Sequence, residues 1–165
     1  MFGRLLLPIA LMLAAASTAR AQVRPDFTGT WRLNLAESDY GDLQGPEART
    51  DVIEQHDGRI SESVTAEGRH RKQHYTLIFA TDGTQTTLPP ETRMGSVTIL
   101  SVSARWQPAS LIVMQKLRFQ DALFEATNTY TLSANGNTLT IALALGGESS
   151  TAATFVFDRI PFDKR

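Results

Sequence analysis

Apolar and polar residues alternate strictly along most of the chain from Phe27 onward, in short runs separated by turn-forming residues. A period of two is typical of β-strands that bury one face and expose the other. Between Leu100 and Trp106, for example, every second side chain is apolar. The pattern predicts eight or nine strands, in the runs 27–35, 50–56, 59–66, 73–81, 97–106, 111–119, 123–133, 138–145 and 151–160.

The connections between these runs indicate how the strands are arranged. Asp57-Gly58, Asp82-Gly83 and Asn135-Gly136 are dipeptides that accept a positive φ and favour tight hairpins. Strands joined by short loops usually pair with their neighbours in sequence, and a sheet of this many strands curls until its edges meet. We therefore predict an all-β fold with little helix, an up-and-down antiparallel meander closed into an eight- to nine-stranded barrel. A β-sandwich is the alternative.

The apolar positions of these runs predict an interior. An eight-stranded barrel is just wide enough to be filled by its own side chains or to hold one small ligand, and the sequence leaves both alternatives open. The long connections 36–49 and 84–96 are candidates for covering an end of the barrel. The candidate ligand-lining residues are Tyr75, Leu77, Phe79, Leu100, Val102, Trp106, Val113, Leu117, Phe119, Phe124, Tyr130, Ile141 and Leu143.

The first 21 residues have the pattern of a secretory signal. Arg4 precedes an apolar stretch at 5–16, and Ala19-Arg20-Ala21 resembles a cleavage site. The apolar stretch is too short to span a bilayer as a helix, which favours a cleaved signal. An uncleaved N-terminal anchor is the alternative. We expect a cleaved signal (1–21), one barrel domain (22–165) without a transmembrane segment, and a periplasmic or secreted location.

Charge and cysteine content exclude several classes of function. The chain has 16 basic and 17 acidic residues, and removing Arg4 and Arg20 with the signal leaves 14 against 17, a net charge of −3. A small acidic excess argues against nucleic acid or anionic lipid as the main partner. The absence of cysteine excludes disulfides, thiol chemistry and cysteine-ligated metals.

Three segments resemble lipocalins and similar exported bacterial β-barrel proteins of the calycin type. They are Gly29-Thr30-Trp31 at the start of the first run, the hairpin 132–136, and the aromatic-x-aromatic-Asp-Arg sequence that ends in Arg159. The resemblance covers roughly residues 26–160 and rests on the order and spacing of these segments. It implies that Trp31 packs at the closed bottom of the barrel with Arg159 across its ring, and that the barrel binds a small hydrophobic molecule.

Candidate chemistry outside this pair is sparse. His70 and His74 share a strand face, but at about 3.3 Å per residue they are too far apart to ligate one metal ion, so we predict a solvated strand end or a weak anion patch. Glu54 and Glu62 fall in strands whose register the sequence leaves undetermined. An inward carboxylate would need a partner and could orient a ligand or act as a general base.

No motif for nucleophilic catalysis, phosphate binding or dinucleotide binding occurs in the sequence. We therefore predict no enzyme activity, no cofactor and no metal, and expect a small hydrophobic ligand in the barrel. The alternatives are a filled barrel acting as an envelope accessory or protein-interaction module and, third, an isomerase- or cyclase-type enzyme with an inward cluster of Glu, His or Tyr. The oligomeric state is not predicted.

Overall fold

The computed structural model describes residues 24–69, 71–146 and 152–161, and the predicted export signal lies outside these ranges. The described chain contains eleven strands and no helix. The strands are β1 (Gly29–Leu33), β2 (Ala48–His56), β3 (Arg59–Gly68), β4 (Arg71–Ala80), β5 (Thr86–Thr87), β6 (Arg93–Met94), β7 (Val97–Gln107), β8 (Ser110–Phe119), β9 (Ala122–Leu132), β10 (Thr138–Leu145) and β11 (Ala153–Ile160).

The predicted all-β meander is confirmed. The nine longer strands correspond to the nine predicted runs, because alternation and turn residues together mark where each strand begins and ends. The two additional strands, β5 and β6, have two residues each and lie in the segment 84–96, which the sequence predicts to be a loop. The strand count is therefore slightly higher than expected.

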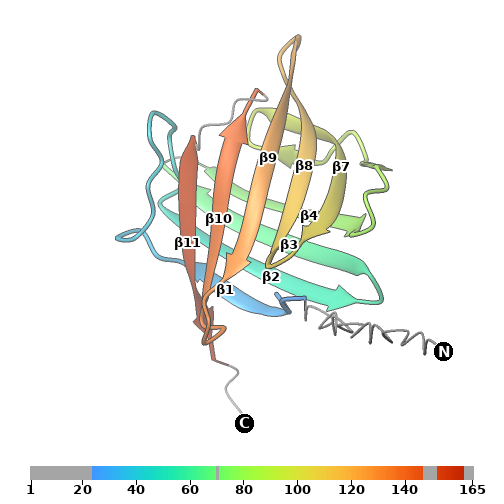
Figure 1. Ribbon diagram of the computed structural model, residues 1–165. Coiled ribbons are helices and arrows are strands. Elements are labelled where there is room, and N and C mark those ends of the chain that lie inside the picture. Colours follow the sequence, from blue (N-terminus) through green and yellow to red (C-terminus); the bar gives the residue numbers. More distant parts are fainter. Residues whose placement is uncertain (1–23, 70, 147–151, 162–165) are drawn as a thin grey trace, which may run out of the picture.

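All pairings are antiparallel, in the order β4-β3-β2-β1-β11-β10-β9-β8-β7-β5, and β6 also pairs with β7. The first and last strands meet, with Trp31 opposite Arg159 and Leu33 opposite Phe157. Figure 1 shows β7 to β11 standing upright across the front, while β2 to β4 cross behind them. The result is a nearly closed barrel, which is compatible with a lipocalin-like fold.

The barrel is not closed by a continuous ladder. The outer edges of β4 and β7 face each other, and the segment between them supplies the short strands that pair with β7, at Thr86 opposite Val102 and at Arg93 opposite Thr98. The bridge between Asp82 and Arg105 ties the same segment to β7. The segment 84–96 therefore fills the seam in the wall rather than covering an end.

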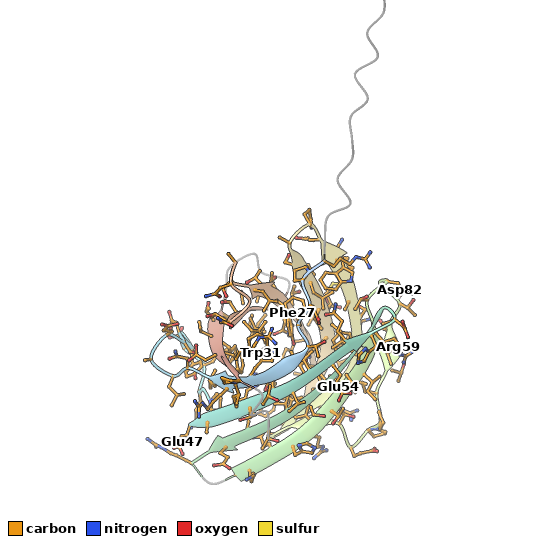
Figure 2. All side chains as sticks on the ribbon, turned by 90° about the horizontal axis from the view of Figure 1, so that it is seen from below. Phe27, Trp31, Glu47, Glu54, Arg59 and Asp82 are labelled. Atoms are coloured by element: carbon orange, nitrogen blue, oxygen red, sulfur yellow. The ribbon has the colours of Figure 1, made fainter. Side chains whose placement is uncertain are left out.

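The two ends of the barrel differ. At the end where β1 begins, which we call the Trp31 end, Phe27 and Trp31 lie among the side chains inside the ring of strands and are fully buried (Figure 2). The ring of Phe27 stacks on Trp106 at 5.9 Å and meets Tyr130 edge-on at 6.0 Å between centroids. The segment 34–47 and the β8–β9 turn lie at the opposite end, because β1 and β8 both run toward it.

Two predicted lining residues do not lie in the core. The register of β7 on β8 shifts between Ile99 and Ser101, so a β-bulge inserts one residue into the alternation. Ile99 is therefore 1% exposed in the core, whereas Leu100 lies outside it. Phe119 belongs to the inward-facing series of β8, but it is the last residue of that strand, and its side chain is 41% exposed at the rim.

Among the described residues, no helix is long and apolar enough to cross a lipid bilayer.

The other predicted lining residues lie on the inner face. Seven of the lining residues are buried and four are partly buried against the core. The buried ones are Leu77, Phe79, Val102, Val113, Leu117, Tyr130 and Ile141, and the partly buried ones are Tyr75, Trp106, Phe124 and Leu143.

Replacing Trp31 by alanine should destabilise the protein by about 3 to 5 kcal/mol, because a fully buried ring is lost and the cavity cannot refill. Urea unfolding followed by circular dichroism measures this loss. Ile78→Ala, on the outer face of β4 with 48% exposure, is the matched control and should cost less than about 1 kcal/mol. A similarly small loss for Trp31→Ala would contradict a structural role for the ring.

Candidate functional site

Trp31 and Arg159 form a structural closure of the barrel. The guanidinium carbon of Arg159 lies 4.1 Å from the centroid of the Trp31 ring. Arg159 also donates hydrogen bonds to the carbonyl oxygens of Thr28 (2.6 Å) and Gly136 (2.8 Å), and the indole N–H donates to the carbonyl of Phe27 at 2.9 Å. A cation over an indole contributes about 0.5 to 2 kcal/mol. These bonds tie β1 to the β9–β10 turn.

A glycine makes this approach feasible. A Cβ atom at Gly29 would lie only 2.5 Å from Nη1 of Arg159, so any larger residue would displace the guanidinium from the ring. The G-x-W spacing thus leaves room for the arginine beside the indole.

The two glutamates with undetermined register face opposite sides. Glu62 pairs with Ile53 and Leu77, both of which are in the core, and it is 1% exposed. Glu54 lies one position away from Ile53 and is exposed. The interior of the barrel therefore contains a carboxyl group that needs partners.

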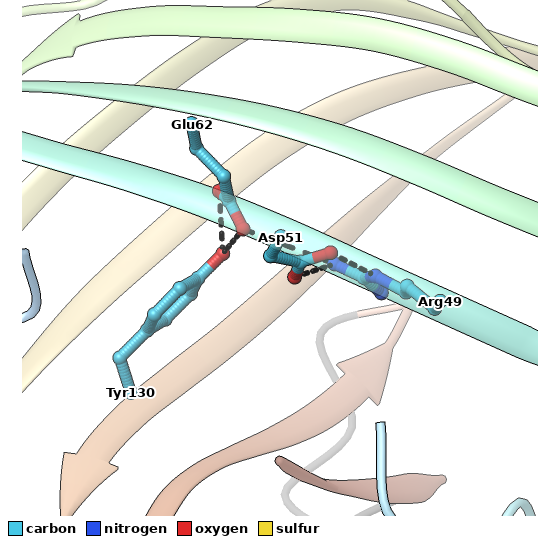
Figure 3. Close-up of polar contacts among 4 residues, drawn as sticks. All are labelled: Arg49, Asp51, Glu62 and Tyr130. Atoms are coloured by element: carbon cyan, nitrogen blue, oxygen red, sulfur yellow. Dashed lines mark hydrogen bonds and ion pairs between the residues drawn. The ribbon is translucent and has the colours of Figure 1, made fainter. Parts of the chain in front are cut away.

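Glu62 belongs to a buried polar cluster with Arg49, Asp51 and Tyr130, which Figure 3 shows. Arg49 donates two hydrogen bonds to Asp51, at 2.8 Å from Nε and 2.7 Å from Nη2. The Tyr130 hydroxyl donates to Glu62 at 2.9 Å, and Nη2 of Arg49 lies 3.8 Å from the same carboxylate. We call these four residues the Arg49–Glu62 cluster.

Aromatic rings hold the guanidinium of Arg49 in place. The guanidinium carbon lies 5.6 Å from the centroid of Phe155 and 5.2 Å from that of Phe157. Arg49 is near the beginning of β2, toward the end of the barrel opposite Trp31, and its side chain is 13% exposed. Of the three charged groups in the cluster, it is therefore the one nearest to solvent.

The cluster contains two carboxyl groups and one cation, which determines where a proton resides. Burial, together with repulsion from Asp51, raises the pKa of Glu62 to about 7. Asp51 accepts both short guanidinium bonds, so it is the carboxylate that stays ionised. Burial opposes the charged form of Arg49, but attraction to Asp51 keeps its pKa above the usual range. Burial likewise raises the pKa of Tyr75 and of Tyr130, which remain hydrogen-bond donors.

The inner face becomes accessible beyond the cluster, toward the end opposite Trp31. The inward residues of β3 shrink in that direction: Ile60, Glu62, Val64, Ala66 and Gly68. On the facing strands, the inward side chains of Asn128, Leu143 and Phe155 are only partly buried, although Ala126 and Leu117 toward the same end are buried. We call this region the mouth and define it by Arg49, Tyr75, Asn128, Leu143 and Phe155.

Asn128 is a member that the sequence analysis missed. It pairs with Val113 and Leu143, which both face inward, so it shares their face, and its side chain is partly exposed. A polar residue in an apolar inward series could have been found by extending the alternation through Tyr130 and Ala126. Asn128 offers both a donor and an acceptor to a bound molecule.

The segment 34–47 packs over one side of the mouth. Asp39 forms a bridge with Thr154, and the ring of Tyr40 lies 5.4 Å from that of Phe155. The Tyr40 hydroxyl is buried, and within the described ranges it has no hydrogen-bond partner. Five large apolar side chains at this end are exposed by 38% or more: Leu35, Leu43, Met94, Phe119 and Leu123.

Two hollows in the described chain lie outside the core. One, of about 450 Å³, opens beside the β8–β9 turn and is lined by residues that include Arg93, Thr98 and Arg118. The other, of about 120 Å³, lies between Gln85 and Glu125. Neither is enclosed by the inward apolar side chains, so the accessible apolar surface of the interior is that of the mouth.

No three potential metal ligands among His, Asp and Glu converge within the described residues. His74 is exposed and bonds with Thr65 (3.1 Å), whereas His70 lies outside the described ranges. Compared with models of known protein families and with well-characterised proteins, the sequence matches none. The geometry and chemistry of the mouth and the cluster therefore carry the functional argument.

The Arg49–Glu62 cluster should make folding stability depend on pH. Folding raises the pKa of Glu62 from 4.5 to about 7. The folding stability that the protonated carboxyl group contributes is therefore fully present below pH 4.5 and is lost as the pH rises through 7. The loss amounts to about 3 kcal/mol. Glu62→Gln keeps an acceptor for Tyr130 and carries no charge, so it should abolish this loss.

Unfolding free energies of wild type and Glu62→Gln, measured between pH 4 and pH 8.5, test the effect. The unfolding free energy of Glu62→Gln should increase relative to that of the wild type as the pH rises. Glu54→Gln, an exposed glutamate on the adjacent strand, is the control and should follow the wild type. Parallel curves for wild type and Glu62→Gln would show that Glu62 does not retain its proton.

Proposed function

We propose that this protein is an exported barrel that binds a small hydrophobic molecule bearing a polar group, with its site at the mouth. The observation that carries the proposal is the asymmetry of the interior. Phe27 and Trp31 are fully buried at the Trp31 end, whereas Tyr75, Leu143 and Phe155 are only partly buried at the opposite end, next to the buried Arg49–Glu62 cluster.

The energetics favour a function for this asymmetry. Placing an Arg, an Asp and a Glu inside a barrel usually stabilises the fold less than apolar residues of the same size would. Perturbed ionisable groups of this kind concentrate at functional sites. Partly exposed Tyr75, Leu143 and Phe155 offer apolar surface, and each Å² that a ligand covers contributes about 25 cal/mol before the cost of association.

The polar groups of the mouth would orient the ligand. The guanidinium of Arg49 lies against two aromatic rings, and Tyr75 and Asn128 lie on the inner faces of β4 and β9. Pockets of this kind combine a mainly apolar lining with a few fixed polar groups. The export pattern of residues 1–21 supports a periplasmic or secreted location for the binding step.

A filled barrel that acts as a protein-interaction module receives less support. It would be expected to carry a contiguous apolar patch on its outer wall. The exposed large apolar residues of the wall, Val52, Ile78 and Met114, lie on β2, β4 and β8, which are not neighbours in the sheet.

The raised pKa of Glu62 favours a second candidate, an isomerase- or cyclase-type enzyme that moves a proton on a bound hydrophobic substrate. A carboxyl group that titrates near neutral pH suits general acid–base chemistry. Glu62 is 1% exposed, so a substrate would have to enter past Arg49 and Tyr75. If the wild type changes the chromatographic retention of a bound molecule and Glu62→Gln does not, this candidate is favoured.

Filling the mouth should block binding. Leu143→Trp adds a large ring to the inner face where Leu143 is only partly buried, so a ligand should lose at least about tenfold in affinity. The experiment has two parts: native mass spectrometry of protein purified gently from its own envelope, and calorimetric titration of the delipidated protein with a panel of small lipophiles.

Ile78→Trp adds the same ring to the outer face of β4 and should bind like the wild type. Both variants should retain the β-sheet circular dichroism of the wild type. Wild-type protein that carries no adduct and binds no lipophile, or equal binding by Leu143→Trp and wild type, would reject the mouth as a ligand site.

A further inference from the structure

The hollow beside the β8–β9 turn carries two arginines in one cross-strand row. Arg93 of β6 pairs with Thr98 of β7, which in turn pairs with Arg118 of β8. Paired residues point to the same face, so the two arginines lie on either side of the nearly buried Thr98, with their Cα atoms separated by two strand spacings, or about 10 Å. All three residues line the hollow of about 450 Å³.

The charge of this hollow is incompletely compensated. Asp121 is the acidic residue in its lining, against Arg93 and Arg118. None of the ion pairs found in the described chain involves either arginine. Two arginines with one acid between them leave a site that an anion can neutralise, and guanidinium groups bind carboxylates and phosphates through paired N–H donors.

The hollow extends to the rim of the mouth. Phe119, which lines it, pairs with Val97, and Val97 packs against the core on the inner face. The turn is a two-residue hairpin in which Gln120 adopts a left-handed conformation with a φ of 52°. Glycine or asparagine is the usual residue at such a φ, so the turn keeps a polar side chain in the hollow despite backbone strain.

We propose that the ligand is an anionic amphiphile, whose charged group binds between Arg93 and Arg118 while its apolar part passes over Phe119 into the mouth. This inference rests on the proposed function and adds the chemical class of the ligand. The shared chemistry is a carboxylate, phosphate or sulfate attached to a hydrocarbon body. Attraction to the arginines across exposed surface should weaken as salt screens it.

Octanoate and 1-octanol test the proposal, because they share a hydrocarbon chain and differ in charge. Calorimetric titration of the wild type at low ionic strength should give an affinity for octanoate about tenfold or more above that for 1-octanol. The double variant Arg93→Gln/Arg118→Gln should lose this preference and bind 1-octanol as the wild type does. Arg59→Gln, an exposed arginine at the Trp31 end, is the control and should keep it.

Each outcome separates the two proposals. Equal affinities for the two probes in the wild type, or a preference that survives in the double variant, would overturn the anion site and leave the mouth intact. Binding of neither probe would reject both. Undiminished octanoate binding by Leu143→Trp would show that the hydrocarbon chain does not enter the mouth. Arginine-dependent sedimentation with phosphatidylglycerol vesicles, without octanoate binding, would assign the arginines to a membrane surface instead.

Discussion

The antiparallel pairing of β1 with β11 is the constraint on which the rest of the structure depends. It joins segments more than 120 residues apart in the chain and sets Trp31 opposite Arg159 in register. Because side chains alternate between the two faces of a strand, the pairing of β1 with β2 on its other side then determines which residues of β2 face inward. Thr30 pairs with Val52 and Trp31 with Asp51, so the same pairing that buries the indole buries a carboxylate beside it.

The Arg49–Glu62 cluster follows from that register. Asp51 is inward because Trp31 is inward, and the two-residue turn at Asp57-Gly58 then brings Glu62 onto the same face through its pairing with Ile53. Two acids thus share one arginine inside the barrel, and a proton on Glu62 balances the charge. The folded interior carries one more negative charge at alkaline pH than at acidic pH, because Glu62 has then lost its proton.

The sequence alone predicts the framework and much of the interior. Nine strands and their order follow from alternation and from turn dipeptides, which are local signals. Arg49 was missed because it precedes the predicted run 50–56, and Asp51 because its inward orientation depends on its pairing with β1, which a long loop separates from β2. The Asp57-Gly58 hairpin could have shown that Glu62 faces inward, since a two-residue turn fixes the register of β2 on β3. The bulge at Leu100 has no sequence signal of its own, because both Ile99 and Leu100 are apolar.

The segment 84–96 fills the seam between β4 and β7 but pairs only with β7, so in the described chain the outer edge of β4 has no partner strand. Such an edge invites pairing with another chain, and natural proteins discourage it with charged side chains. β4 begins with exposed Arg71 and Lys72, and Lys72 forms an ion pair with Glu67 at 2.9 Å. Charged side chains at the beginning of β4 are of the kind that disfavours the addition of a strand from another chain to this edge.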